Sequence, residues 1–142
     1  MSKFFAKTEE SLPIMLLRAR EALLLRLRPI LQAHGLTEQQ WRVLRVLDEV
    51  GPLEPTVLGE RCVVLTPSLT RILSALEQRE FILREKHETD KRKQIIHLTQ
   101  SGQDQITIIA PAAKLVYDEL EESFGKAQLV NLLNKLKRIS EF

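Results

Sequence analysis

The sequence predicts a mainly α-helical protein with one small β-hairpin. Apolar residues recur every three or four positions through most of the 142 residues, as on one face of a helix. That period changes from helical to alternating in two short strand-like runs, FILREK and QIIHL. Gly and Pro separate the helical stretches from one another. The length suits a single domain.

The N-terminal third of the chain predicts two helices. Residues 10–33 carry apolar side chains spaced alternately by three and four, and Gly35 is placed to end this helix in a left-handed cap. The segment LTEQQWRVLRVL then begins a second helix, because Thr37 with Gln40 three residues later is a capping-box pattern.

The middle of the chain predicts a short helix and a longer one. After Gly51-Pro52, Pro55 begins a helix that runs to about Cys62. The next helix begins at Thr66, which we expect to cap it, with Pro67 at the first helical position. Its apolar stripe is Leu69, Ile72, Leu73 and Leu76. Its polar face carries Thr70, Arg71, Ser74 and Gln78.

The C-terminal half predicts a hairpin and two more helices. FILREK and QIIHL flank the charged tip HETDKRK, and LTQSG begins a long helix that ends near Gly125. A last helix carries Leu129, Leu132, Leu133, Leu136 and Ile139. The terminal regions 1–35 and 100–142 hold more apolar surface than a compact unit at 37–99 needs, which favours burial against a second copy. An intramolecular helical bundle is the alternative.

Composition argues against several classes of protein. No signal segment opens the chain, the apolar runs are too short to span a membrane, and the single Cys62 cannot form an internal disulfide, so we expect a cytoplasmic protein. We expect neither an enzyme nor a metal or cofactor site, because no phosphate loop or nucleophile elbow occurs and the histidines stand apart. These are His34, His87 and His97.

The order short helix, turn, second helix and hairpin is that of a winged helix-turn-helix, whose second helix enters the major groove of DNA. A net charge of +2 does not by itself indicate a nucleic-acid partner, but basic residues cluster in the hairpin. The helix that begins at Thr66 carries short or forked hydrogen-bonding groups, which suit base edges and phosphates. The candidate DNA contacts are Thr66, Ser68, Thr70, Arg71, Ser74, Lys91, Arg92 and Lys93.

The hairpin tip is the predicted wing. We expect Asp90 to hold Arg92, or an arginine of the preceding helix, so that the cations of the tip reach a negative minor groove. Taken alone, the tip is also compatible with a solvated turn, and the polar helix face with a merely solvated surface.

Three segments together resemble the multiple-antibiotic-resistance regulator (MarR) family: LTEQQWRVLRVL, LTPSLTRILSALEQREFILRE and TDKRKQIIHLTQSG. LLRAREALLLRLRPILQAHGLTEQQWR with TPSLT is most similar to the branch that regulates homoprotocatechuate operons. The resemblance implies one MarR-type domain over residues 1–142, a winged helix-turn-helix flanked by N- and C-terminal dimerisation helices. It also implies a homodimeric repressor on palindromic double-stranded operator DNA, released by a small aromatic carboxylate.

One position departs from the family pattern. Glu80 stands where such proteins usually place a Gly that ends the second helix of the motif. A non-Gly residue in a left-handed cap costs about 1 kcal/mol, so we expect another geometry at that helix end.

An aromatic carboxylate would need a cation and an apolar wall. Arg20 borders the apolar stripe of the first helix and can hold a carboxylate through its guanidinium fork, with Trp41 and Arg45 as further candidates. Alternatively, the arginines pair with Glu21, Glu49 or acidic residues of a second copy, and Trp41 belongs to the core.

Two other functions are compatible with the sequence. One is a winged-helix module that binds protein but not DNA. Such a module would not cause a salt-dependent mobility shift of duplex DNA. The other is an oxidant-sensing repressor that uses Cys62, although a lone Cys on an apolar helix is more often a small buried hydrophobe.

Overall fold

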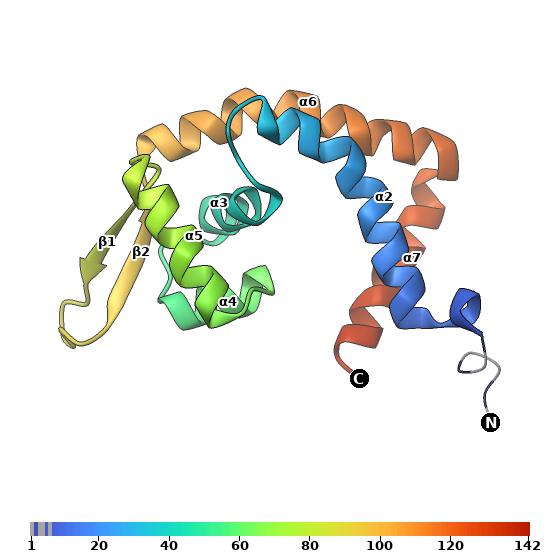
Figure 1. The fold of residues 1–142 in the computed structure, drawn as a ribbon, viewed down its shortest axis with the longest axis horizontal. Coiled ribbons are helices and arrows are strands. Elements are labelled where there is room, and N and C mark those ends of the chain that lie inside the picture. Colours follow the sequence, from blue (N-terminus) through green and yellow to red (C-terminus); the bar gives the residue numbers. More distant parts are fainter. Residues whose placement is uncertain (1, 3–4, 6) are drawn as a thin grey trace. The chain divides into compact units, whose positions relative to one another are not determined.

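A computed structural model describes residues 2, 5 and 7–142 (Figure 1). The elements are η1 (Thr8–Glu10), α2 (Leu12–Gln32), α3 (Glu38–Val50), α4 (Pro55–Cys62), α5 (Thr66–Gln78), β1 (Ile82–Lys86), β2 (Gln94–Leu98), α6 (Gln100–Phe124) and α7 (Lys126–Ser140). The predicted helical fold with one hairpin is therefore confirmed. The chain forms two compact units, one up to Ile109 and one from Ala110. In the described part of the chain, no helix is long and apolar enough to cross a membrane.

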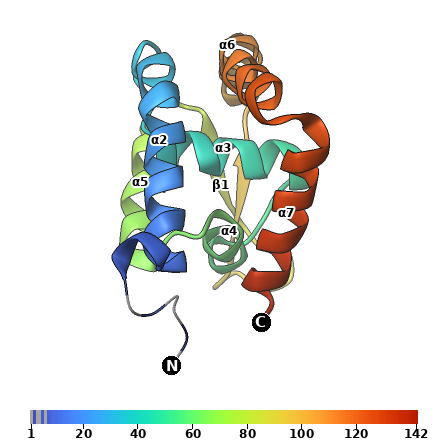
Figure 2. The same ribbon diagram turned by 90° about the vertical axis from the view of Figure 1, so that its right-hand side faces the viewer.

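Helix α3 lies at the centre of the first unit, where it packs against α2, α4, α5 and β2. Figure 2 shows α3 running across the view with α4 beneath it. Val43 and Leu44 of α3 are fully buried. The predicted capping box is present, since Thr37 Oγ1 accepts from the Gln40 amide and the Gln40 side chain accepts from the Thr37 amide, both at 3.1 Å. The helix therefore starts where its sequence pattern predicts.

Strands β1 and β2 form an antiparallel hairpin that pairs Ile82 with Leu98 and Lys86 with Gln94. Leu53, in the loop between α3 and α4, extends this sheet by exchanging two backbone hydrogen bonds with Ile96 at 2.8 and 3.2 Å. Ile96 is fully buried. The base of the hairpin is therefore fixed to the helical core, while its tip projects beyond it (Figure 1).

The start of α5 differs by one residue from the prediction. Leu65, with φ −69° and ψ 148°, is the N-cap, and no side chain caps the helix. Thr66 is the first helical residue and Pro67 the second, so the prediction that Thr66 caps α5 is wrong. The extended conformation of Leu65 already ends the preceding turn, which leaves the first backbone N–H groups of α5 without a side-chain acceptor.

The end of α5 keeps the left-handed geometry that we expected Glu80 to avoid. Glu80 has φ +62°, its amide donates to the Glu77 carbonyl at 2.9 Å, and the Phe81 amide donates to the Leu76 carbonyl at 3.0 Å. These bonds form a Schellman motif, which usually adds an apolar contact between the residues at its ends. Phe81 and Leu76 are both buried. The free energy gained by burying two large apolar side chains exceeds the left-handed backbone penalty of about 1 kcal/mol.

Gly102 permits the close approach of α6 to the base of the hairpin. A Cβ at this position would lie 2.3 Å from the carbonyl oxygen of Phe81. Thr99 joins the same elements, because its hydroxyl donates to the Glu80 carbonyl at 2.6 Å and accepts from the Gly102 amide at 3.0 Å. The LTQSG segment thus ends the hairpin and begins α6, as predicted.

The second unit contains the last part of α6 and all of α7. Gly125, with φ +85°, separates the two helices. The Lys114 ammonium pairs with Asp118 one helical turn away, which raises the pKa of Lys114. No residue of α7 is buried, and several of its apolar side chains are 39–58% exposed. These are Val130, Leu132, Leu133 and Ile139.

Candidate nucleic-acid interface

Helix α5 divides into a buried apolar side and an accessible polar side, as its sequence predicts. Leu69, Ile72, Leu73 and Leu76 are 0–7% exposed. The side chains of Thr70, Arg71 and Ser74 are exposed, and Ser68 is half-buried. The core therefore fixes the rotation of α5 about its axis and leaves one polar face available to a partner.

The hydroxyl groups of this face have different hydrogen-bonding capacities. Thr70 Oγ1 donates to the backbone carbonyl of Thr66 at 3.0 Å, so it is left as an acceptor, which suits the amino group of adenine or cytosine. Ser74 Oγ instead accepts from Arg84 Nη2 at 3.3 Å, which leaves its own hydrogen to donate. Thr70 therefore offers an acceptor to a partner, and Ser74 offers a donor.

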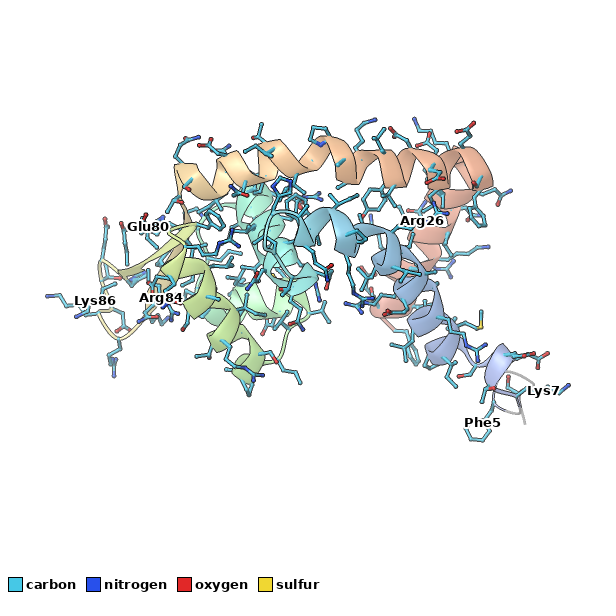
Figure 3. All side chains as sticks on the ribbon, turned by 45° about the horizontal axis from the view of Figure 1, so that its top comes forward. Phe5, Lys7, Arg26, Glu80, Arg84 and Lys86 are labelled. Carbon is cyan, nitrogen blue, oxygen red and sulfur yellow. The ribbon has the colours of Figure 1, made fainter. Side chains whose placement is uncertain are left out.

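Arg84 is a component of this surface that sequence reasoning missed. Its Nε is buried without a hydrogen-bond partner, 3.5 Å from a carboxylate oxygen of Glu77. Figure 3 shows Arg84 on the hairpin beside α5. A hollow of about 690 Å³ is lined by Arg84 together with Thr66 and Thr70. Strand alternation could have found Arg84, because it lies two residues after the buried Ile82 and so faces the same side of the hairpin.

The wing tip has the predicted internal support. Asp90 Oδ1 accepts from the Arg92 amide at 3.1 Å and from Arg92 Nε at 3.3 Å. The Arg92 side chain is 93% exposed, and Lys91 is exposed beside it. Lys93 is less available, because its Nζ lies 3.8 Å from a carboxylate oxygen of Glu54. Contact between the tip and a minor groove stays a prediction.

The three candidate effector residues form two separate contacts in the described structure. Arg20 Nη2 lies 3.1 Å from Glu38 Oε2, so Arg20 has a carboxylate partner, although not the expected Glu21. Glu21 is instead held by Arg28, whose hydrogen bond lowers the pKa of Glu21.

The other contact involves Trp41, which is 6% exposed and belongs to the core. The guanidinium carbon of Arg45 lies 5.9 Å from the centroid of the Trp41 ring, within the range of a cation–π interaction. The effector role of Arg20, Trp41 and Arg45 stays a prediction.

The structure gives no support to an oxidant-sensing role for Cys62. Its side chain is fully buried, and burial raises the pKa of the thiol, an effect that the nearby Arg42 only partly offsets. Redox-sensing cysteines are usually accessible and largely ionised. Among the described residues, no group of three or more His, Cys, Asp or Glu side chains could hold a metal ion.

Known proteins resemble this chain along most of its length. Residues 36–94 match the MarR family model, a segment that runs from the start of α3 into β2. The homoprotocatechuate degradative operon repressor of Escherichia coli is 38% identical, with 90% of this chain and 86% of that protein aligned. The HTH-type transcriptional regulator FarR of Neisseria gonorrhoeae is 36% identical, with 92% and 90% aligned.

A solved structure agrees with these relatives. The crystal structure of NadR in complex with 4-hydroxyphenylacetate superimposes with a TM-score of 0.85, at 36% identity, over 93% of this chain and 94% of that one. The match includes the helix-turn-helix, the hairpin and the helices on either side. The chain belongs to the MarR family of winged-helix transcriptional regulators.

Proposed function

We propose that this protein is a homodimeric repressor that binds a palindromic operator and is released by a small phenolic carboxylate. Each protomer places the outer face of α5 in a major groove and the tip of the hairpin over the adjacent minor groove. A two-fold dimer presents two copies of α5, so its operator has two half-sites. Their centres are about one turn of DNA, about 10 base pairs, apart.

The observation that carries the proposal is the polar face of α5. Its position is fixed by a buried apolar stripe, while Thr70, Arg71 and Ser74 lie accessible on the other side. Arg71 can grip guanine through two acceptors, and Thr70 and Ser74 supply an acceptor and a donor. The exposed Lys91 and Arg92 add positive charge beside this face, as a phosphate backbone requires.

Dimerisation is supported by apolar side chains that the chain leaves exposed. Leu132 and Leu133 of α7 are 50% and 58% exposed, and Leu17 and Leu25 of α2 are 65% and 69% exposed. Exposed apolar side chains concentrated on helices mark protein interfaces. A second copy of the chain is the occupant that a palindromic operator requires.

The effector class is supported by two relatives. One is named for the homoprotocatechuate degradative operon, and NadR was solved with 4-hydroxyphenylacetate. In this chain, the guanidinium of Arg20 is half-exposed and shares its partner Glu38 with Arg42. A ligand carboxylate can therefore replace Glu38 at Arg20 without leaving Glu38 unpaired, which lowers the cost of burying the ligand's charge.

Operator titrations with and without ligand test the proposal. For the wild type, 4-hydroxyphenylacetate or its 3,4-dihydroxy analogue is expected to weaken operator binding. A hundredfold preference for the conformation that cannot bind DNA corresponds to about 2.7 kcal/mol, enough to empty an operator held near its midpoint. Arg20→Ala is expected to bind operator but to lose the response to ligand.

The control is Arg28→Ala, which removes an arginine of the same helix that pairs with Glu21 rather than Glu38. This variant should respond like the wild type, after both variants are checked to be folded dimers. If Arg20→Ala also responds like the wild type, Arg20 is structural. If no aromatic acid weakens binding of the wild type, the effector class is wrong, while the proposal of operator binding stands.

A further inference from the structure

The turn between α4 and α5 has an unfavourable backbone conformation. Val63 has φ +56° and ψ +53°, in the left-handed region that β-branched residues rarely adopt. Its side chain is 82% exposed, so burial of this side chain does not offset the strain. Other contacts must hold the turn in place.

Two kinds of hydrogen bond hold this turn. Within the turn, the Val63 amide donates to the Glu60 carbonyl at 3.3 Å and the Val64 amide donates to the Gly59 carbonyl at 3.0 Å, which ends α4 in a Schellman motif. From outside it, Arg42 Nη1 donates to the carbonyl of Cys62 at 2.6 Å and to that of Val63 at 3.3 Å. Bonds from a charged donor are stronger than those between neutral groups.

Arg42 is itself held in one orientation. Its Nε and Nη2 donate to the two carboxylate oxygens of Glu38 at 3.0 and 2.8 Å, one helical turn earlier in α3. The two side chains are only 25% and 18% exposed, so little water competes for the pair. Arg20 of α2 donates to the same carboxylate at 3.1 Å. The guanidinium therefore has little freedom to leave the turn.

The turn determines where α5 begins. Leu65, the N-cap of α5, follows Val63 by two residues, and the N-cap has no side-chain hydrogen bond to fix the first turn. The candidate contacts from Thr66 to Arg71 all lie within the next six residues. The buried stripe of α5 begins only at Leu69, so the backbone at Val63 controls the first turn of α5 before the core fixes the helix.

We propose that Arg42 is a positioning residue for DNA recognition. It holds the left-handed turn at Val63 so that α5 enters the major groove in one register, and it does not touch DNA itself. This inference rests on the proposed function, because it needs α5 to read the operator. It predicts that the loss of Arg42 reduces discrimination between sequences more than it reduces binding to DNA in general.

A matched control lies at the other end of α5. Arg79 also donates to two backbone carbonyls of a neighbouring turn, those of Gly35 at 2.7 Å and His34 at 3.0 Å, and its guanidinium lies over the Phe81 ring. Arg79→Met removes the same charge and the same number of carbonyl bonds as Arg42→Met. A purely structural role for Arg42 would make the two variants behave alike.

The experiment compares the full-length wild type, Arg42→Met, Arg79→Met and Arg42→Met combined with Val63→Gly. Kd is measured at one salt concentration for a duplex selected by the wild type and for a scrambled duplex, and urea unfolding gives the stability of each variant. Amide hydrogen exchange without DNA then reports on the amides of Val64 and Leu69, which donate to the carbonyls of Gly59 and Leu65 at 3.0 and 2.9 Å.

For Arg42→Met, we expect the Kd of the scrambled duplex divided by that of the selected duplex to fall about tenfold, and exchange of the Val64 and Leu69 amides to accelerate. Arg79→Met should lose stability while keeping this ratio and the exchange rates of these two amides. Val63→Gly should restore much of the ratio to Arg42→Met, because Gly adopts the left-handed conformation without strain.

The proposal is overturned if Arg42→Met keeps the wild-type ratio, if Arg79→Met lowers the ratio equally, or if Val63→Gly restores none of it. A wild type that binds selected and scrambled duplexes equally would instead contradict the proposed function. Hydrogen exchange still tests the role of Arg42 in that case. Unchanged exchange in Arg42→Met would show that Arg42 does not hold the turn.

Discussion

Helices α5 and α7 have similar sequence patterns but different surroundings. Both carry leucine-rich stripes at helical spacing, over 13 and 15 residues. The stripe of α5 is at most 7% exposed, whereas no residue of α7 is buried. The pattern therefore predicts that a face is to be buried, but not whether the same chain or another one covers it.

The two helices also differ in what their accessible faces can bind. The accessible face of α5 is polar and carries Arg71, which suits a polyanion. The apolar stripe of α7 is itself accessible, which suits a protein. The proposed function assigns the polar face of α5 to DNA and the apolar stripe of α7 to another copy of the chain. Each assignment can be tested separately.

The largest expected effect is at α7. Leu132→Asp with Leu133→Asp should convert the dimer to monomer, because each protomer loses two half-exposed leucines that the partner would cover. Four such side chains in the dimer correspond to about 3 kcal/mol, roughly a hundredfold in the dimer Kd, before charge repulsion is added. Analytical ultracentrifugation measures the change, and operator affinity should fall with it.

Asn131→Asp is the matched control, since it adds a charge to the side of α7 that carries no apolar stripe. It should leave the dimer intact. A double-aspartate variant that sediments like the wild type would remove α7 from the interface, as would a wild type that is already monomeric.

The next effect is at the polar face of α5. Arg71→Ala should weaken operator binding by about 1 to 3 kcal/mol and relax the preference at one position of each half-site. Selection from a randomised duplex library measures both. Arg138→Ala, which removes an exposed arginine from α7, controls for net charge. An unchanged sequence preference in Arg71→Ala would exclude Arg71 from base recognition.

A smaller effect is expected at the wing. Arg92→Ala or Lys91→Ala should weaken binding to all sequences and flatten the dependence of log Kd on log salt by about one unit for each phosphate that a bound copy no longer neutralises. Lys93→Ala should change the slope less, because Lys93 is paired with Glu54. A weaker sequence preference at an unchanged slope would contradict a backbone or minor-groove role for the tip.

The smallest effect on DNA binding is expected at Cys62, at the end of α4. Peroxide should leave operator binding of the folded protein unchanged, and a thiol reagent should react quickly only in urea, because the thiol is buried. Burial raises the pKa of the folded thiol above its ordinary value of 9.0, so stability should fall as pH rises through about 9, where only the unfolded thiol ionises. Cys62→Ala should lose this pH dependence. Rapid reaction of the native protein would restore the oxidant-sensing alternative.

The features that could be predicted from sequence depend on residues close together in the chain. The Thr37–Gln40 capping box and the Asp90–Arg92 contact span three and two residues. The bounds of α4 were predicted from Gly51-Pro52 and Pro55, and the buried stripe of α5 from its helical spacing, which are also local signals.

The features that could not be predicted join residues far apart. Arg84 reaches Ser74 across 10 positions, Arg20 reaches Glu38 across 18, and Arg42 reaches the Cys62 carbonyl across 20. No helical or strand period relates such pairs, since the contacts form only once the elements pack. The left-handed Glu80 was predicted wrongly for a different reason, because burial of Phe81 and Leu76 outweighs the backbone preference of Glu80.

Selection of bound duplexes from a random-sequence library tests sequence-specific binding by paired copies of α5 most directly. The expected result is a palindromic motif with half-site centres about 10 base pairs apart, enriched by the wild type and lost with the Leu132→Asp, Leu133→Asp variant. Enrichment of no motif, or equal binding of every duplex, would contradict the assignment of α5 as the helix that reads DNA.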